Sequence, residues 1–209
     1  MAHPITITYK SIHHYLVDCR NGKLLVDAGW AVSMPELTHG LGRYGIELSD
    51  IKYVMMTHSH PDHAGLTQEV KNACGARLLI HERQIPYLQD LLAFYQRRGG
   101  YEPIVVGPDD IVVKSDGSRE TLNSIGIDGE IVETPGHSDD SISLVLDSGI
   151  AFVGDLRTPD QVDSDSYEVV CDSWRKLLSL NVQTAYPAHA GPIQAKDVEK
   201  LLSDSPSGT

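Results

Sequence analysis

The segment THSHPDHAG, residues 57–65, crowds together side chains that can bind metal: His58, His60, Asp62 and His63. His58 and His60 are two residues apart, so in an extended segment both imidazoles point the same way. Imidazole nitrogens suit zinc, iron, manganese and copper, and a carboxylate adds a hard oxygen donor. The segment therefore predicts a metal site.

The number of donors in this segment favours two metals over one. Four neighbouring donors cannot all be ideal ligands of one tetrahedral zinc ion and still leave an open position. Two metals about 3.5–4 Å apart can instead clamp the attacking and leaving oxygens of a hydrolytic reaction. Such a pair needs ligands from elsewhere, and the candidates lie at predicted strand ends: His137 in TPGHS, Asp155 in AFVGD and His189 in AYPAHAG.

Other polar and apolar residues have two interpretations each. Asp27 in LVDAG either orients a ligand imidazole from behind or only caps a turn. Trp30 and Met34, just after that turn, either form an apolar wall for substrate or pack under a loop. The remaining histidines are interpreted as structural or exposed, with His14 and His81 as the two that could border the site: His3, His13, His14, His39 and His81.

The elements that must position these groups can be read from the hydrophobic pattern. Alternating or continuous apolar runs predict strands at 5–9, 13–18, 23–29, 51–57 and 76–81. A helix is predicted to start at Ser33, which has capping-box spacing to Glu36 with Pro35 in the first turn. A short helix follows Gly65, and residues 115–130 are rich in turn residues.

The segment QIPYLQDLLAFYQRR, residues 84–98, has the strongest amphipathic pattern, with Ile85, Leu88, Leu92 and Tyr95 on one face. It is interpreted as a helix packed on the core. A lid over the site, or a contact in a homodimer, is the alternative.

A weak internal repeat indicates the architecture. Both HHYLVDCRNGKLLVDAG and DSISLVLDSGIAFVGD read as strand, tight turn, strand, small residue and Asp. Each is followed by a helical pattern and then by a strand that runs into a histidine loop. We therefore expect an α/β fold, a duplicated sandwich with its site between two similar halves.

Bulk composition limits the class of protein. A chain of 209 residues predicts a single domain over 1–209, with 203–209 as a disordered tail. The net charge of −12 argues against nucleic acid and anionic membranes as partners, which leaves a small-molecule substrate. The expected location is the cytoplasm, because no secretory signal or spanning segment is present and three widely spaced cysteines suit free thiols: Cys19, Cys74 and Cys171.

These motifs resemble the metallo-β-lactamase superfamily over nearly the whole chain. The H-x-H-x-D-H motif is filled by His58, His60, Asp62 and His63, and the later His, Asp and His positions by His137, Asp155 and His189. The resemblance implies a four-layer αββα sandwich of two mixed sheets. It also implies that His58, His60 and His137 hold one metal, that Asp62, His63 and His189 hold the other, and that Asp155 bridges them.

The resemblance also narrows the reaction. True β-lactamases of the superfamily usually carry Cys or Ser in place of Asp155, whereas glyoxalase II-like thioesterases share this complete ligand set. The leading hypothesis is a binuclear hydrolase that uses a metal-bridging hydroxide on an ester, thioester or lactone, most simply with two zinc ions, with iron or manganese as other choices. Asp62 could orient the nucleophile or shuttle a proton.

Two other classes of function are weighed against the hydrolase. One resembles the persulfide dioxygenases of the same superfamily, with a single iron held by His58, His137 and Asp155. The other is a non-catalytic metal-binding domain. The complete ligand set argues against the latter, since a structural zinc site is closed by four ligands.

Overall fold

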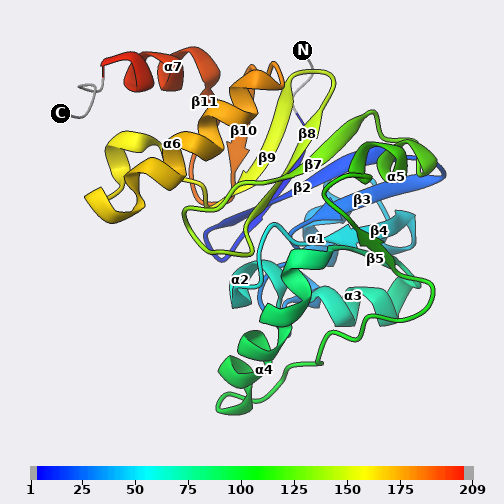
Figure 1. The fold of residues 1–209 in the computed structure, drawn as a ribbon. Helices are drawn as coiled ribbons and strands as arrows, with labels where there is room; N and C mark the ends of the chain where they lie inside the picture. Colours follow the sequence, from blue (N-terminus) through cyan, green and yellow to red (C-terminus); the bar gives the residue numbers. More distant parts are fainter. Residues whose placement is uncertain (1–3, 205–209) are drawn as a thin grey trace.

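Two β-sheets form the centre of the computed structural model, which describes residues 4–204 (Figure 1). The first sheet has the strand order β1-β2-β3-β4-β5-β6 and the second β11-β10-β9-β8-β7. The strands of the first sheet are β1 (Ile5–Tyr9), β2 (Ile12–Cys19), β3 (Gly22–Val26), β4 (Ile51–Met55), β5 (Arg77–His81) and β6 (Ile111–Val113). Those of the second are β7 (Gly129–Glu133), β8 (Ile142–Leu146), β9 (Ile150–Gly154), β10 (Thr184–Pro187) and β11 (Ile193–Gln194).

Helices lie on the outer sides of this pair of sheets, with α6 and α7 beside the second sheet and α1 and α3 beside the first (Figure 1). The α-helices are α1 (Met34–Gly42), α2 (Pro61–Ala64), α3 (Thr67–Cys74), α4 (Leu88–Gln96), α5 (Ser118–Ser124), α6 (Ser164–Ser179) and α7 (Ala195–Asp204). Short 3₁₀ helices are η1 (Leu48–Asp50), η2 (Glu82–Tyr87) and η3 (Pro159–Gln161). Within residues 4–204 no helix has both the length and the hydropathy that a membrane span requires.

The inner strands β3, β8 and β9 are buried on both faces, which explains their continuous apolar runs. Along β3, Leu24 and Val26 face the core between the sheets, whereas Leu25 faces the core under α1 and α3. Along β9, Phe152 faces the core between the sheets and Val153 the core under α6 and α7. Because side chains alternate between the two faces of a strand, each sheet separates two cores. This arrangement is the predicted αββα sandwich.

The two halves repeat one order of elements. Strands β2 and β3 pair antiparallel, the chain crosses over through α1, and β4 pairs parallel with β3. In the second half, β8 and β9 pair antiparallel, the chain crosses over through α6, and β10 pairs parallel with β9. The structure thus confirms the internal repeat. It directs β3, β4, β9 and β10 so that the loops after them can meet at one edge of the sandwich.

The halves are joined by backbone contacts at this edge. The Ile142 amide donates to the Thr57 carbonyl at 2.9 Å, and the His13 amide donates to the Ala188 carbonyl at 2.8 Å. Gly154, with φ +56°, lies against Thr57 so closely that a Cβ at Gly154 would clash with the Thr57 hydroxyl and lie 2.8 Å from its Cβ. A glycine is therefore required where β9 passes the histidine segment.

The amphipathic segment 84–98 differs from the predicted single helix. Pro86 lies in η2, and α4 begins only at Leu88. The buried residues of α4 are Leu91 and Tyr95, while Ile85 is 38% exposed, so the predicted apolar face is wrong in part. The interpretation as a core-packing helix is confirmed, because both Leu91 and Tyr95 belong to the core under the first sheet.

Three other expectations differ in detail. The helix begins after Ser33, but its predicted capping box with Glu36 is absent, because Lys10 Nζ donates to Ser33 Oγ at 2.7 Å and pairs with Glu36 at 3.4 Å. The turn-rich stretch 115–130 contains α5. The first two residues of the tail predicted over 203–209 belong to α7, which extends to Asp204, and the rest of that stretch lies outside the described residues.

Replacing Gly154 should destabilise the joint between the halves. We expect Gly154→Ala to lower the free energy of unfolding by about 1–3 kcal/mol from its left-handed backbone alone, with the contact to Thr57 adding to the loss. Gly42→Ala is the control, because Gly42 has no atom within 4 Å of its Cβ position and should be neutral or stabilising. Chemical denaturation of both variants measures the difference, and equal stabilities would contradict the requirement for glycine.

Candidate metal centre

The histidine segment lies in the loop that follows β4. Its first part bends at residues 57–59, with His58 buried and His60 exposed as the residue before α2. Pro61 then starts α2, the position where a proline costs a helix nothing because its missing N–H would have no partner. The single turn of α2 carries Asp62 and His63, and the His63 ring lies 4.0 Å from that of His58. One short segment can therefore supply two neighbouring groups of ligands.

The first group consists of His58, His60 and His137, whose ligand atoms all lie within 4.8 Å of one another. His137 comes from the loop after β7, and its Nε2 lies 2.9 Å from Nδ1 of His60. Gly136, with φ +138°, allows this loop to pass close to α6, where an added Cβ would lie 2.6 Å from Val170 Cγ2. Three imidazoles converge here.

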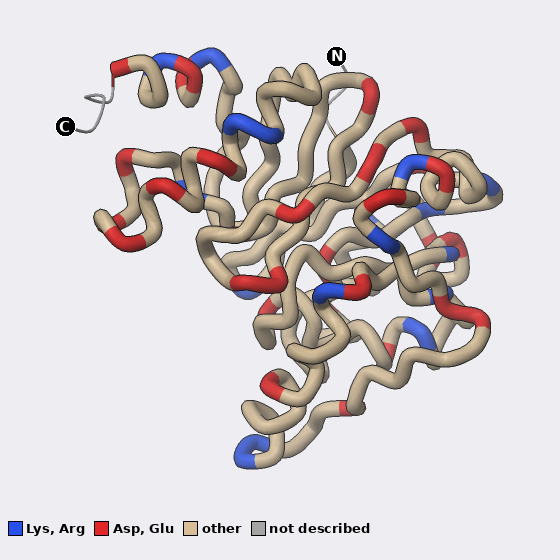
Figure 2. The backbone as a smooth tube through the Cα atoms, in the orientation of Figure 1, with Lys and Arg blue, Asp and Glu red and all other residues tan. Residues whose placement is uncertain are grey.

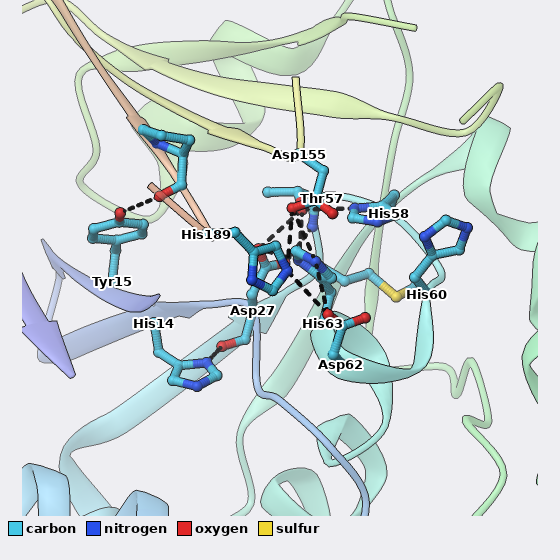
Figure 3. A network of polar contacts seen from close by, with 12 residues as sticks. His14, Tyr15, Asp27, Thr57, His58, His60, Asp62, His63, Asp155 and His189 are labelled. Carbon is cyan, nitrogen blue, oxygen red and sulfur yellow. Dashed lines mark hydrogen bonds and ion pairs between the residues drawn. The ribbon is translucent and has the colours of Figure 1, made fainter. Parts of the chain in front are cut away.

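The second group consists of Asp62, His63 and His189, whose ligand atoms likewise lie within 4.8 Å of one another. His189 follows β10, and its Nε2 lies 3.0 Å from Asp62 Oδ2. The Nε2 atom of His63 lies 3.7 Å from the same carboxylate oxygen. In Figure 3 the rings of His63 and His189 and the Asp62 carboxylate face one another.

Asp155, the residue after β9, lies between the two groups. Its Oδ1 lies 3.3 Å from His63 Nε2 and 3.5 Å from His189 Nε2. Its Oδ2 lies 3.4 Å from Nε2 of His137, in the first group. The structure thus brings all seven residues of the sequence-predicted ligand set together, and one carboxylate faces both groups.

Several atoms of this cluster are buried without a hydrogen-bond partner. Among the described residues they include His58 Nε2, His63 Nε2 and Asp155 Oδ1. Buried polar atoms are nearly always hydrogen-bonded, so three such atoms facing one space need another partner. Imidazole nitrogens and carboxylate oxygens are suitable ligands for zinc, iron or manganese. The residues therefore fit one or more divalent cations.

The charges in the cluster favour the same conclusion. Burial, reinforced by the neighbouring imidazoles, holds the pKa of His58 well below its usual value, so its ring is neutral and can donate a lone pair. Burial also disfavours a charge on His63, yet the carboxylates of Asp27 and Asp155 outweigh it and raise the pKa of His63 to about 10. The carboxylates thus attract positive charge, which a cation can supply instead of a proton.

Asp27 fixes the orientation of the buried part of the cluster from behind. Its Oδ1 accepts from the Thr57 amide at 2.6 Å, and its Oδ2 accepts from the Thr57 hydroxyl at 2.9 Å. The same Oδ2 lies 2.9 Å from His63 Nδ1, so that nitrogen carries a proton and Nε2 faces the cluster, where a cation could replace the second proton. Asp27 therefore does more than cap a turn.

Three supporting contacts were not predicted from the sequence. The Ser11 carbonyl accepts from His189 Nδ1 at 2.8 Å, and the Asp27 carbonyl accepts from the buried His14 Nδ1 at 2.7 Å. Buried Asp140 accepts from the Ser59 amide at 2.8 Å and so joins the loops of the first group. Only Asp140, an acidic residue just beyond the TPGHS motif, offered a local signal.

The cavity beside the cluster has a volume of about 290 Å³ and is bordered by His137, Asp155 and His189. The rest of its lining is formed by Gly154, Leu156, Arg157, Gln161, Pro187, Ala190 and Ile193. Met34 packs against the core, and the Trp30 ring lies 6.4 Å from that of Phe94. A substrate wall formed by Trp30 and Met34 stays a prediction. His81 contacts Ser115 and lies outside the cluster.

Comparison with known families identifies this arrangement. The family model of the metallo-β-lactamase superfamily matches residues 10–189. The chain belongs to this superfamily. Its members are mostly hydrolases.

The relatives of the chain include proteins of different names. A beta-lactamase-like protein 2 homolog of Drosophila melanogaster is 26% identical over 195 residues, which cover 91% of this chain and 62% of the relative. The atrochrysone carboxyl ACP thioesterase of Aspergillus fumigatus is 30% identical over 195 residues, covering 90% of this chain and 39% of the relative. The chain thus spans less than two thirds of the length of these curated relatives.

Solved structures share the fold of the superfamily. A metallo-β-lactamase family protein from Thermus thermophilus, TTHA1429, superposes with a TM-score of 0.70 over 96% of this chain and 78% of its own. The two sequences are 20% identical, so this likeness concerns the fold.

Replacing Asp27 should weaken metal binding by the cluster of histidines and aspartates. In Asp27→Asn an N–H₂ group replaces one of the two acceptor oxygens, so the contacts to Thr57 and His63 cannot all be kept. We expect the affinity for zinc to fall by roughly 10- to 100-fold, as for other residues that orient ligands. Competition with a fluorescent chelator measures this, with Asp116→Asn on the exposed surface as control. Equal affinities would contradict the role of Asp27.

Burial of His14 should make stability depend on pH. Burial lowers the pKa of His14 to about 4, so between about pH 6.5 and 4 the unfolded chain binds a proton there that the folded chain does not. The free energy of unfolding should therefore fall as the pH is lowered through this window, by up to about 3 kcal/mol. The stabilising contribution of neutral His14 is fully present above about pH 6.5. His14→Asn keeps a donor for Asp27 but cannot titrate, and its denaturation curves in chelator-treated protein should show a shallower dependence. Parallel profiles would refute this.

Proposed function

We propose that the chain is a binuclear metal-dependent hydrolase that acts on a small ester, thioester or lactone. The observation that carries this proposal is the position of Asp155, whose two oxygens face different groups of ligands. A single metal held by His58, His63 and Asp155, whose ligand atoms also lie within 4.8 Å of one another, would leave the other four residues without a metal. Two metals would give each of the seven residues a cation to bind, and a shared carboxylate can bridge two cations.

The proposed ligand sets follow the two groups. His58, His60 and His137 would hold one cation, Asp62, His63 and His189 the other, and Asp155 would contact both. When bound, two divalent cations lower the pKa of water toward neutrality and polarise a carbonyl oxygen. Zinc is the simplest choice for this donor set, with iron or manganese as alternatives.

Asp62 is the proposed catalytic carboxylate among these residues. Its side chain is 20% exposed and that of His189 is 40% exposed, whereas that of His63 is fully buried, so Asp62 is the carboxylate of its group that can reach a substrate. From there it could orient the attacking water or pass a proton to the leaving group. His189, held by the Ser11 carbonyl, limits the movement of Asp62 through their 3.0 Å contact.

The substrate class rests on the cavity and on the relatives. A cavity of about 290 Å³ beside Asp155 suits a small molecule. A thioesterase at 30% identity supports carbonyl chemistry of the thioester type.

The three free cysteines are consistent with a reducing compartment, and we propose the cytoplasm.

Metal content is the first test of the proposal. Protein purified without added metal should contain about two zinc, iron or manganese equivalents per chain by elemental mass spectrometry, and it should hydrolyse members of a panel of esters, thioesters and lactones. A single iron equivalent that resists exchange with zinc, together with consumption of oxygen in the presence of persulfides, would overturn the hydrolase and favour a dioxygenase.

Asp155→Ala tests the bridging carboxylate. We expect this variant to lose metal and hydrolysis together, because both groups of ligands lose a shared partner. His39→Ala is the control, since His39 lies on α1 and belongs to none of the ligand groups. Hydrolysis by Asp155→Ala at full metal loading would exclude Asp155 as the bridge.

A further inference from the structure

The cavity beside the cluster contains one basic side chain that the proposed reaction does not use. Arg157 lies two residues after Asp155 and is exposed. It lines the 290 Å³ cavity and also an adjoining hollow of about 190 Å³, and His137 likewise borders both. No other Lys or Arg lines either one. Arg157 therefore lies where the two spaces meet, next to the cluster of histidines and aspartates.

Arg157 has no ion pair or side-chain hydrogen bond within the described part of the chain, although acidic residues surround it in the sequence. It is the only Lys or Arg between Arg119 and Arg175. The nearby carboxylates have other partners: Asp160 accepts from the Thr158 hydroxyl at 2.6 Å, and Asp163 accepts from the Ser166 amide at 3.0 Å. Asp155 faces the histidines. An acidic neighbourhood thus leaves its one guanidinium free.

The backbone holds Arg157 in this place. The indole Nε1 of Trp174, a fully buried side chain of α6, donates to the Arg157 carbonyl at 2.8 Å. The anchoring atom belongs to the main chain, so the guanidinium itself is not needed for the fold. A fixed backbone with a free cationic side chain beside a cavity is suited to recognising an anion.

The surrounding charge limits what kind of anion can bind. The protein has a net charge of −12, and acidic residues occur in all parts of the fold, including α6 beside the cavity (Figure 2). Asp163 lines the same hollow as Arg157. A doubly charged phosphate would meet this carboxylate, whereas a singly charged carboxylate needs only the one guanidinium.

We infer that Arg157 selects substrates that carry a carboxylate near the scissile carbonyl. This inference rests on the proposed hydrolase and names its substrate class. The scissile group lies beside Asp155 in the larger cavity, and the carboxylate of the acyl or leaving group binds the guanidinium at the junction of the two spaces. Arg157 acts as a specificity residue and takes no part in bond breaking.

Matched substrates test this selection. One pair is the succinyl and butyryl thioesters of N-acetylcysteamine, and the other is the butyryl thioesters of 3-mercaptopropionate and of its amide. Within each pair only one compound carries the carboxylate. We expect the zinc-loaded protein to prefer the anionic member of at least one pair by about tenfold or more in kcat/KM, as hydrogen bonds between charged groups allow.

Variants show whether Arg157 causes the preference. Arg157→Gln should lower kcat/KM for the anionic substrate by roughly 10- to 100-fold and leave its neutral partner within about twofold. Arg157→Lys should keep part of the preference because it keeps the charge. Arg175→Gln removes the same charge from α6, at a residue that lines neither space, and should behave as the wild type. A preference that survives in Arg157→Gln, or none in the wild type, would overturn the inference.

Binding separates this inference from the proposed function. Inert thioether analogues of each pair, with a methylene in place of the carbonyl, can be titrated calorimetrically into the zinc-loaded protein. An anionic preference that Arg157→Gln abolishes, without hydrolysis of any substrate, would support the role of Arg157 and refute the hydrolase. Hydrolysis without any anionic preference would do the reverse.

Discussion

The buried carboxylate of Asp27 is the contact on which the arrangement of the site depends. It accepts from the Thr57 amide and hydroxyl and from His63 Nδ1, so it connects the end of β3, the end of β4 and the turn of α2. Its own backbone has φ +60°, a left-handed conformation that aspartate tolerates better than most residues. The buried His14 donates a hydrogen bond from Nδ1 to the carbonyl of Asp27. A charge that is 1% exposed needs all of these partners, and each of them is thereby fixed in place.

The duplicated fold divides the ligands between two halves, neither of which completes the site. The first half supplies the histidine segment after β4, and the second supplies His137, Asp155 and His189. Asp27 and Asp155 occupy corresponding positions in the two halves, since Asp27 follows β3 as Asp155 follows β9. The two aspartates have different contacts. Asp27 lies behind an imidazole, and Asp155 lies among the ligands. Packing of the two sheets is therefore a condition for the site, and the close passage of Gly154 past Thr57 marks where it occurs.

The distribution of charge separates structural from functional basic groups. Acidic residues are distributed along the whole described backbone (Figure 2). Several basic side chains have partners in the fold, as Lys71 has in the partly buried Asp110 and Lys10 has at the start of α1. In the cluster of histidines and aspartates the situation is reversed. Within residues 4–204, carboxylates and imidazoles converge there without a Lys or Arg among them, and Arg157 at the edge has no side-chain partner. Positive charge is thus left to be supplied at the cluster, and one guanidinium remains available to a ligand.

The sequence by itself determined the local part of this protein. The period of the apolar residues located the strands, the repeat of strand, turn and strand indicated two halves, and the spacing of His58, His60, Asp62 and His63 indicated a metal site. These are properties of neighbouring residues, which depend on backbone direction and side-chain period. The start of α1 was predicted from the same signals. The predicted capping box is absent, because Lys10, in the turn between β1 and β2, donates to the Ser33 hydroxyl.

Only the tertiary structure decided which distant groups meet and with what geometry. His189 and Asp62 are separated by 127 positions and lie 3.0 Å apart, and the division of the Asp155 oxygens between two groups has no counterpart in local spacing. The same holds for the Ser11 carbonyl behind His189 and for the buried face of α4. Such distances depend on how two sheets pack and twist against each other. Packing of that kind is set by the whole core and is not encoded in any single segment.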